Sequence, residues 1–284
     1  MRGEFVDLHG VRLYCYAFGQ RGAGHPIVLV HGSFTSSHLW QDVLPRLPKG
    51  HRVLVLDLLG HGRSDPPGTA DMSVAGHAAR LAQLLDVMGV PSAMLVGHGM
   101  GAAIAARVAH EQPARIAHLM LVNPTLLAAT APEARLNRRV RRLAMLVPLW
   151  KRLAPSWLAS ALHAALLPGF AHRDVGARAL DVYLQPFRLR DGRDAACAQL
   201  VALNRSRGDT VDALAPGALH CPTALVLGDA DPFLNAARSA RLVTWIGQAT
   251  NTRATIHQLP GVAHVAPEEA PDRLGTLVGE LLTR

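Results

Sequence analysis

Short apolar runs alternate with amphipathic stretches along most of the chain. Two segments of alternating polarity, residues 5–8 and 11–18, predict strands joined at His9-Gly10. Further apolar runs predict strands at 27–30, 52–57, 93–96, 116–122, 222–227 and 254–259, and helical spacing predicts helices at 36–47, 74–88, 102–110, 236–246 and 267–282. Buried strands that are each followed by a helix predict a mostly parallel sheet covered by helices on both faces.

This repeat is interrupted between Pro124 and about Leu219, where helical patches and prolines occur without a strand-like run. The expected organisation is a core domain at 1–123, a helical insertion at 124–219 and the rest of the core at 220–284. Ligands of such sheets bind outside the carboxyl ends of the strands. We therefore expect the insertion to form a cap over that edge.

Composition fits a globular protein, with 284 residues and 49% hydrophobic content. The formal charge of +8 comes mostly from arginine, and no basic stripe interleaved with aromatic residues is present, so no nucleic-acid partner is expected. Three widely spaced cysteines give neither a disulfide framework nor metal spacing. No phosphate loop, metal cluster or dinucleotide fingerprint appears, so we expect no metal and no cofactor.

The first residues carry no apolar signal core, and no uninterrupted apolar run reaches membrane-spanning length. We expect a soluble cytoplasmic protein that is a monomer or a homodimer.

The most informative stretch is Gly97-His98-Gly99-Met100-Gly101. It lies between the predicted strand at 93–96 and an Ala-rich helix at 102–110. Strand, sharp glycine turn and helix form the context of the nucleophile elbow, G-x-S-x-G. Here the middle residue is Gly99, which has no nucleophilic side chain.

Three other features follow predicted strands. His31-Gly32-Ser33-Phe34 would turn the Ser33 N–H into the crevice, and with the Met100 N–H it would form an oxyanion hole. Asp231 follows the strand at 222–227, and His264 follows the last strand. Alone, Asp231 fits an ordinary turn before Pro232, and His264 is one of 15 histidines. The chain order elbow, Asp, His favours a catalytic pair.

Together these motifs resemble the α/β-hydrolase family, in the capped branch that holds esterases, C–C hydrolases, haloperoxidase-like enzymes, epoxide hydrolases and dehalogenases. The Asp57 to Ser64 loop belongs to the same resemblance as a structural signature. The resemblance implies an α/β-hydrolase fold with a helical cap, Asp231 as the acid, His264 as the base and Ser33 and Met100 as oxyanion donors. The residues expected to line the substrate pocket are His31, Phe34, His98, Trp157 and Phe170.

Family members have Ser, Asp or Cys where this chain has Gly99, and the flanking residues look most like the serine branch. One hypothesis is a hydrolase for a small apolar or amphiphilic, carbonyl-containing substrate, in which His264 and Asp231 activate water or abstract a proton. The alternatives are a non-catalytic ligand-binding protein and a serine hydrolase inactivated by a Ser-to-Gly change at position 99. Ser33 as a relocated nucleophile is less favoured, because no strained turn presents its hydroxyl.

The start of the insertion is basic and amphipathic. One interpretation is an outer cap helix with a solvated arginine face, and the other is contact with an anionic membrane or an amphiphilic substrate. The cations are Arg135, Arg138, Arg139, Arg141, Arg142, Lys151 and Arg152.

Overall fold

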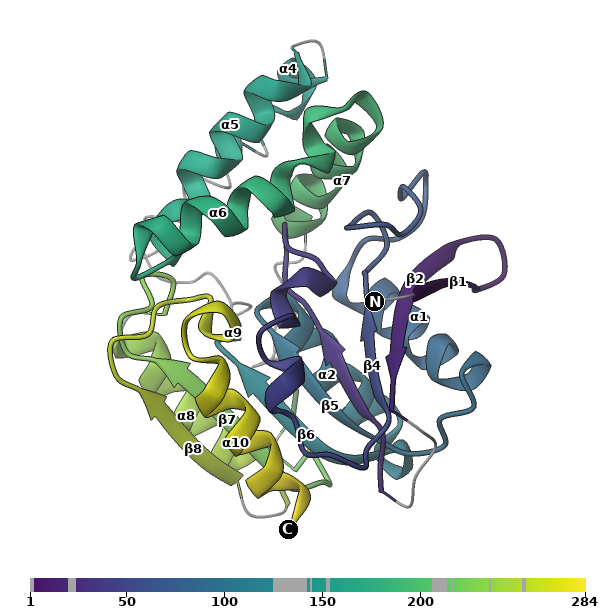
Figure 1. The fold of residues 1–284 in the computed structure, drawn as a ribbon, viewed down its shortest axis with the longest axis vertical. Helices are drawn as coiled ribbons and strands as arrows, with labels where there is room; N and C mark the ends of the chain where they lie inside the picture. The colour runs from purple at the N-terminus through teal and green to yellow at the C-terminus, as the bar shows by residue number, and fades with distance from the viewer. Residues whose placement is uncertain are drawn as a thin grey trace.

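The computed structural model describes residues 3–19, 24–124, 142–143, 145–151, 154–205, 214–215, 217–234, 236–251 and 254–284. An eight-stranded sheet has the order β1-β2-β4-β3-β5-β6-β7-β8 (Figure 1). The β1–β2 and β2–β4 pairs are antiparallel, and the strands from β4 through β3 to β8 pair in parallel. The predicted α/β-hydrolase architecture is confirmed.

The strands are β1 (Gly3–Asp7), β2 (Arg12–Phe18), β3 (Ile27–Val30), β4 (Val53–Leu56), β5 (Ala93–His98), β6 (Ile116–Val122), β7 (Thr223–Gly228) and β8 (Ala254–Leu259). The α-helices are α1 (Val74–Val87), α2 (Met100–Glu111), α4 (Val147–Trp150), α5 (Pro155–Leu166), α6 (Arg173–Leu184), α7 (Arg190–Arg205), α8 (Ala236–Ala249), α9 (Ala266–Glu269) and α10 (Pro271–Leu282).

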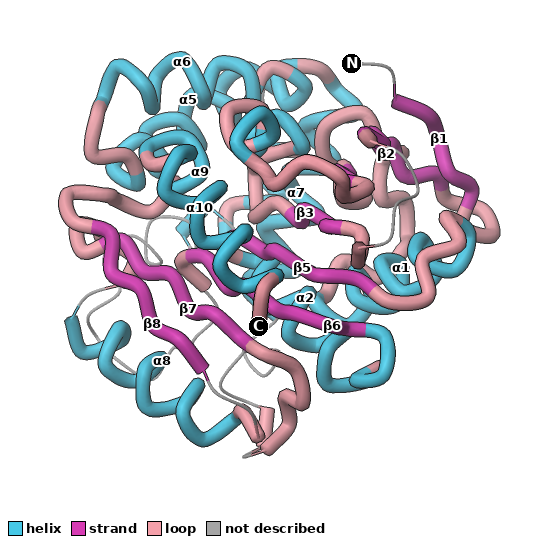
Figure 2. The backbone as a smooth tube through the Cα atoms, turned by 60° about the horizontal axis from the view of Figure 1, so that its bottom comes forward, coloured by secondary structure: helices cyan, strands magenta, loops and turns pink. Residues whose placement is uncertain are grey.

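Two apolar layers enclose the sheet. One contains the buried faces of α1, α2 and α8, and the other contains that of α10 (Figure 2). Every residue of β3, β4, β5 and β7 is buried, as continuous apolar runs predict for strands covered on both faces. Cys15, Cys197 and Cys221 are buried, and burial raises the pKa of Cys15 to about 12.

Two predicted helices differ from the structure, and proline explains both differences. Residues 36–47 form two short 3-10 segments, Ser37–Trp40 and Leu44–Arg46, because Pro45 has no N–H to continue an α-helix. The predicted helix at 267–282 is divided into α9 and α10. Pro271 disfavours helical geometry at the preceding Ala270, whose φ and ψ are −138° and 51°.

Helices α4 to α7 lie between β6 and β7 in the sequence and above the strand ends in space (Figure 1). Their apolar side chains share a core with α10, including Leu158, Leu162 and Leu200. The Gln199 amide of α7 donates to the carbonyl of Gly60 at 2.8 Å, which joins this layer to the loop after β4. Within the described residues, no helix has the length and apolar character needed to cross a membrane.

Candidate active site

The elbow is a tight turn from β5 into α2, with Gly99 at its apex. Gly99 has φ 57° and ψ −117°, a backbone conformation that costs glycine little and other residues much more. A Cβ atom on Gly97 would lie 2.3 Å from the carbonyl oxygen of Gly101, and one on Gly101 would lie 2.3 Å from that of Val30. The flanking glycines are therefore required for strand and helix to approach. The elbow backbone is present, although its apex lacks a side chain.

The two residues expected to supply the oxyanion N–H groups, Ser33 and Met100, are in contact through their side chains. The Ser33 hydroxyl is 3.4 Å from the sulfur of Met100. Met100 is the first residue of α2, where a backbone N–H has no acceptor inside its own helix. Phe34 next to them has φ 58° and is buried against Phe187 of the insertion, with ring centroids 6.2 Å apart.

Asp231 and His264, which are 33 positions apart in the chain, form a buried pair. His264 Nδ1 lies 2.8 Å from Asp231 Oδ2, and the other carboxylate oxygen accepts the Phe233 N–H at 2.7 Å. The Asp231 side chain is fully buried, whereas that of His264 is 11% exposed. A carboxylate at Nδ1 keeps the proton on that nitrogen and leaves the Nε2 lone pair free to accept one.

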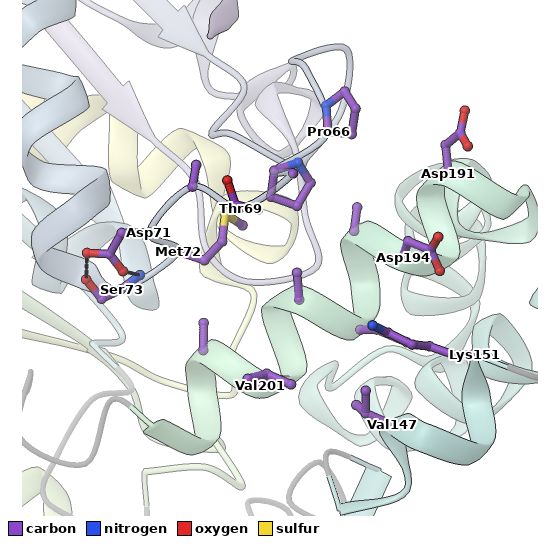
Figure 3. A pocket seen from close by; sticks show the side chains of 17 residues that line it. Pro66, Thr69, Asp71, Met72, Ser73, Val147, Lys151, Asp191, Asp194 and Val201 are labelled. Atoms are coloured by element: carbon purple, nitrogen blue, oxygen red, sulfur yellow. Dashed lines mark hydrogen bonds between the residues drawn. The ribbon is translucent and has the colours of Figure 1, made fainter. Parts of the chain in front are cut away.

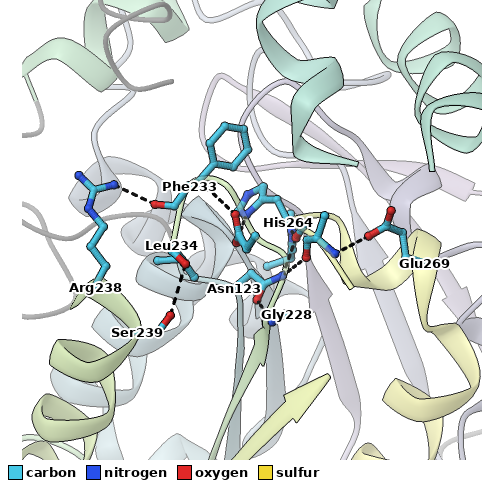
Figure 4. A network of polar contacts seen from close by, with 11 residues as sticks. Asn123, Gly228, Phe233, Leu234, Arg238, Ser239, His264 and Glu269 are labelled. Atoms are coloured by element: carbon cyan, nitrogen blue, oxygen red, sulfur yellow. Dashed lines mark hydrogen bonds and ion pairs between the residues drawn. The ribbon is translucent and has the colours of Figure 1, made fainter. Parts of the chain in front are cut away.

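The carbonyl of His264 accepts hydrogen bonds from two buried side chains, and Figure 4 shows one of them, Asn123. Asn123 Nδ2 donates to it at 2.7 Å, and His98 Nε2 donates at 2.9 Å. The Asn123 amide oxygen also accepts the Gly228 N–H at 2.8 Å, which ties the end of β6 to the end of β7. Asn123 and His98 are thus positioning residues for His264.

The insertion also holds the histidine loop. The His264 N–H donates to the carbonyl of Gly169 at 2.9 Å. One carboxylate oxygen of Glu269 accepts the Ala263 N–H at 2.7 Å, and the other accepts the Ala171 N–H at 2.6 Å. Glu269 therefore bridges the loop that carries His264 and the turn before α6.

Sequence reasoning did not find Asn123 or Glu269. A signal existed for Asn123, because it is a polar residue directly after the apolar run at 119–122. None existed for Glu269, since its two backbone partners, Ala171 and Ala263, are 92 residues apart in the chain.

Three buried histidine rings form a row that links the end of β3, the loop after β4 and helix α1: His31, His61 and His77. The ring centroids of His31 and His61 are 5.0 Å apart, and those of His61 and His77 are 6.3 Å apart. His31 Nε2 accepts the Leu58 N–H at 2.9 Å, so its proton is on Nδ1, facing the carbonyl of Gly32. Burial lowers the pKa of each to about 3, and it lowers the pKa of His98 to about 3 as well.

We expect these four histidines to make the protein sensitive to acid. Their pKa values are lowered in the folded state, so below pH 6.5 the unfolded chain binds more protons and the free energy of unfolding falls as pH falls. Each of the four histidines should lower the free energy of unfolding by about 1 kcal/mol between pH 6.5 and pH 5.5. Urea unfolding at both pH values measures the loss. His77→Leu should reduce the dependence of the free energy of unfolding on pH by about one proton. His110→Ala, on the exposed surface, is the control and should leave this dependence unchanged. Equal stability of the parent chain at both pH values would contradict the expectation.

The expected pocket residues have different surroundings. His31, Phe34, His98 and Phe170 are buried. Both ring nitrogens of His31 face backbone groups, so this side chain holds the loops after β3 and β4. The expectation for Trp157 is wrong, because its side chain is 61% exposed. Helix α5 buries the stripe that contains Leu158 and Leu162, and Trp157 falls outside that stripe.

A cavity of about 770 Å³ lies away from this site, between residues 66–73 and helix α7 (Figure 3). The residues that line the cavity include Met72, Val147, Lys151 and Asp194. Gly99, Asp231 and His264 are not among them. In the described ranges, no group of three or more His, Cys, Asp or Glu side chains is placed to hold a metal ion.

The model of one protein family, described as the alpha/beta hydrolase fold, matches residues 25–271. The chain belongs to the α/β-hydrolase fold family. A crystal structure of Cfl2 from Burkholderia cenocepacia has a TM-score of 0.82 and 25% identity, covering 99% of this chain and 95% of that one.

Among curated relatives, a putative carbamate hydrolase of Variovorax paradoxus is 31% identical over 87% of this chain and 88% of its own length. A 2-hydroxymuconate semialdehyde hydrolase of a Pseudomonas species is 27% identical over 92% of this chain and 88% of its own length. The match to uncharacterized mycobacterial proteins, at 38% identity over 120 residues, spans only 34% of their length. Two of these relatives are therefore named as hydrolases, each of a different substrate.

Proposed function

We propose that this α/β-hydrolase-fold protein is a hydrolase for a small, apolar, carbonyl-containing substrate, and that it uses water in place of a covalent nucleophile. The observation that carries the proposal is the intact pair of His264 and Asp231, 2.8 Å apart, beside an elbow whose apex is Gly99. An aligned base next to a missing nucleophile leaves water as the group to activate.

In this mechanism water occupies the space of the absent hydroxymethyl group. His264 Nε2 takes a proton from the water while the water oxygen attacks the substrate carbonyl carbon. Asp231 stabilises the resulting imidazolium, and the N–H groups of Ser33 and Met100 stabilise the oxyanion. Collapse of the tetrahedral intermediate breaks the bond to the leaving group, which receives the proton from His264.

The expected rate enhancement is modest. Serine enzymes without their triad retain about 10³–10⁴-fold catalysis over water, so activated or strained substrates suit this site best. The same pair of residues can also remove a proton from carbon, and that reaction would need no nucleophile at position 99.

A pre-steady-state measurement with activated aryl esters tests the direct use of water. We expect turnover without a burst of the aryl leaving group, and an unchanged intact mass during turnover, because no acyl-enzyme forms. A stoichiometric burst with an added acyl mass would overturn this mechanism and point to a relocated nucleophile such as Ser33.

A second candidate is a non-catalytic protein that binds a small apolar ligand beneath the cap. Gly99 itself favours it, since a binding pocket needs no nucleophile. Absence of turnover across esters and activated diketones, together with ligand binding that is unchanged in His264→Ala, would support this candidate and refute the hydrolase.

A further inference from the structure

The net charge of the protein is concentrated in one segment. Residues 134–173 contain eight of the 29 Lys and Arg residues and none of the 21 Asp and Glu residues. The remaining 21 cations therefore balance the 21 acids, and the whole formal charge of +8 belongs to this segment. Such separation of charge along the chain makes this segment attractive to anions. Five of the eight cations lie outside the described residues: Arg135, Arg138, Arg139, Arg141 and Arg152.

The described part of this segment also exposes apolar side chains. Met145 is 68% exposed, and Leu146, Leu149 and Trp157 are 45–61% exposed. They are four of the nine large hydrophobic residues that are exposed within the described ranges, and they fall within 13 positions. Helix α4 forms the outer end of the insertion in Figure 1, far from the sheet.

Two exposed cations, Arg142 and Lys151, lie in the same stretch. We call the six residues Arg142, Met145, Leu146, Leu149, Lys151 and Trp157 the cap tip. Single exposed apolar residues are ordinary, whereas several of them near a tryptophan and cations are typical of an interaction surface.

We propose that the cap tip docks on an anionic membrane surface. The leucine and methionine side chains would enter the boundary between headgroups and acyl chains, and the Trp157 indole would lie at headgroup level, where tryptophan is enriched. Arg142 and Lys151 would pair with lipid phosphates. The exposed aliphatic side chains favour lipid over nucleic acid, which is bound mainly through polar and basic contacts. The proposal does not depend on turnover.

Co-sedimentation with vesicles of phosphatidylglycerol and of phosphatidylcholine tests the proposal. We expect binding to the anionic vesicles that weakens with added salt, and little binding to neutral ones. Arg142→Gln with Lys151→Gln should lower the partition coefficient roughly 25-fold, about fivefold for each cation. Leu149→Ser with Trp157→Ser should also lower it, because each loses buried apolar area at the interface.

Matched controls are Lys49→Gln and Val87→Ser, an exposed cation and an exposed apolar residue outside the insertion. Both should leave vesicle binding unchanged, and circular dichroism should confirm that all variants are folded. Trp157 gives an independent signal, since its emission should shift to shorter wavelength with anionic vesicles and Trp157→Phe should remove the shift. Equal binding to both lipids, no binding, preference for nucleic acid over vesicles, or cap-tip variants that bind like the parent would each overturn the proposal.

Discussion

Gly99→Ser should raise the hydrolysis of short-chain aryl esters by at least about 10³-fold over the parent chain. The elbow backbone and the His264–Asp231 pair are in place, and Ser33 and Met100, the proposed oxyanion donors, are in side-chain contact. Serine at the apex would supply a nucleophile to them, and loss of the serine from a complete triad costs about 10⁶-fold. The variant should also show an acyl-enzyme burst.

The same substitution should lower stability, because φ 57° and ψ −117° suit glycine better than a residue with a Cβ atom. We expect a loss of about 1–3 kcal/mol in the free energy of unfolding. Gly99→Ala is the matched control, since it carries the same backbone strain without a hydroxyl group. It should lose similar stability and gain no activity. A serine variant that is no more active than the alanine variant would show that the site cannot act as a serine hydrolase.

His264→Ala should abolish turnover in both the parent chain and the Gly99→Ser background, with losses of at least about 10³-fold. Its ring is the group that accepts the proton, from water in the parent and from the serine hydroxyl in the variant. Steady-state rates with one aryl ester in the four proteins measure both effects. The loss should be larger in Gly99→Ser than in the parent chain, because base and nucleophile act as a unit in that variant.

His110→Ala, a change of an exposed histidine on α2, provides the control and should retain full activity in both backgrounds. If the parent hydrolyses esters equally well with and without His264, the proposed base is wrong. Activity that appears only in Gly99→Ser and depends on His264 would instead favour a serine hydrolase that has lost its nucleophile.

Local patterns in the sequence were sufficient for the sheet and for the order of the motifs. Continuous apolar runs such as those of β3, β5 and β7 can be read directly, because a strand buried on both faces has no polar side. The predicted helix boundaries were wrong at Pro45 and Pro271, where proline interrupts a helix that the apolar periodicity continues. Helical spacing also misplaced Trp157, since periodicity does not say which stripe of a helix finds a partner.

For the site, the sequence by itself determined the residue types and their order along the chain: a glycine-framed elbow, then Asp231, then His264. Tertiary structure decided the rest. The 2.8 Å contact between Asp231 and His264, the grip of Asn123 and His98 on the His264 carbonyl, and the bridge through Glu269 all join segments distant in sequence. Such contacts depend on how the strand ends pack against the insertion, and local sequence propensity does not specify the packing of distant segments.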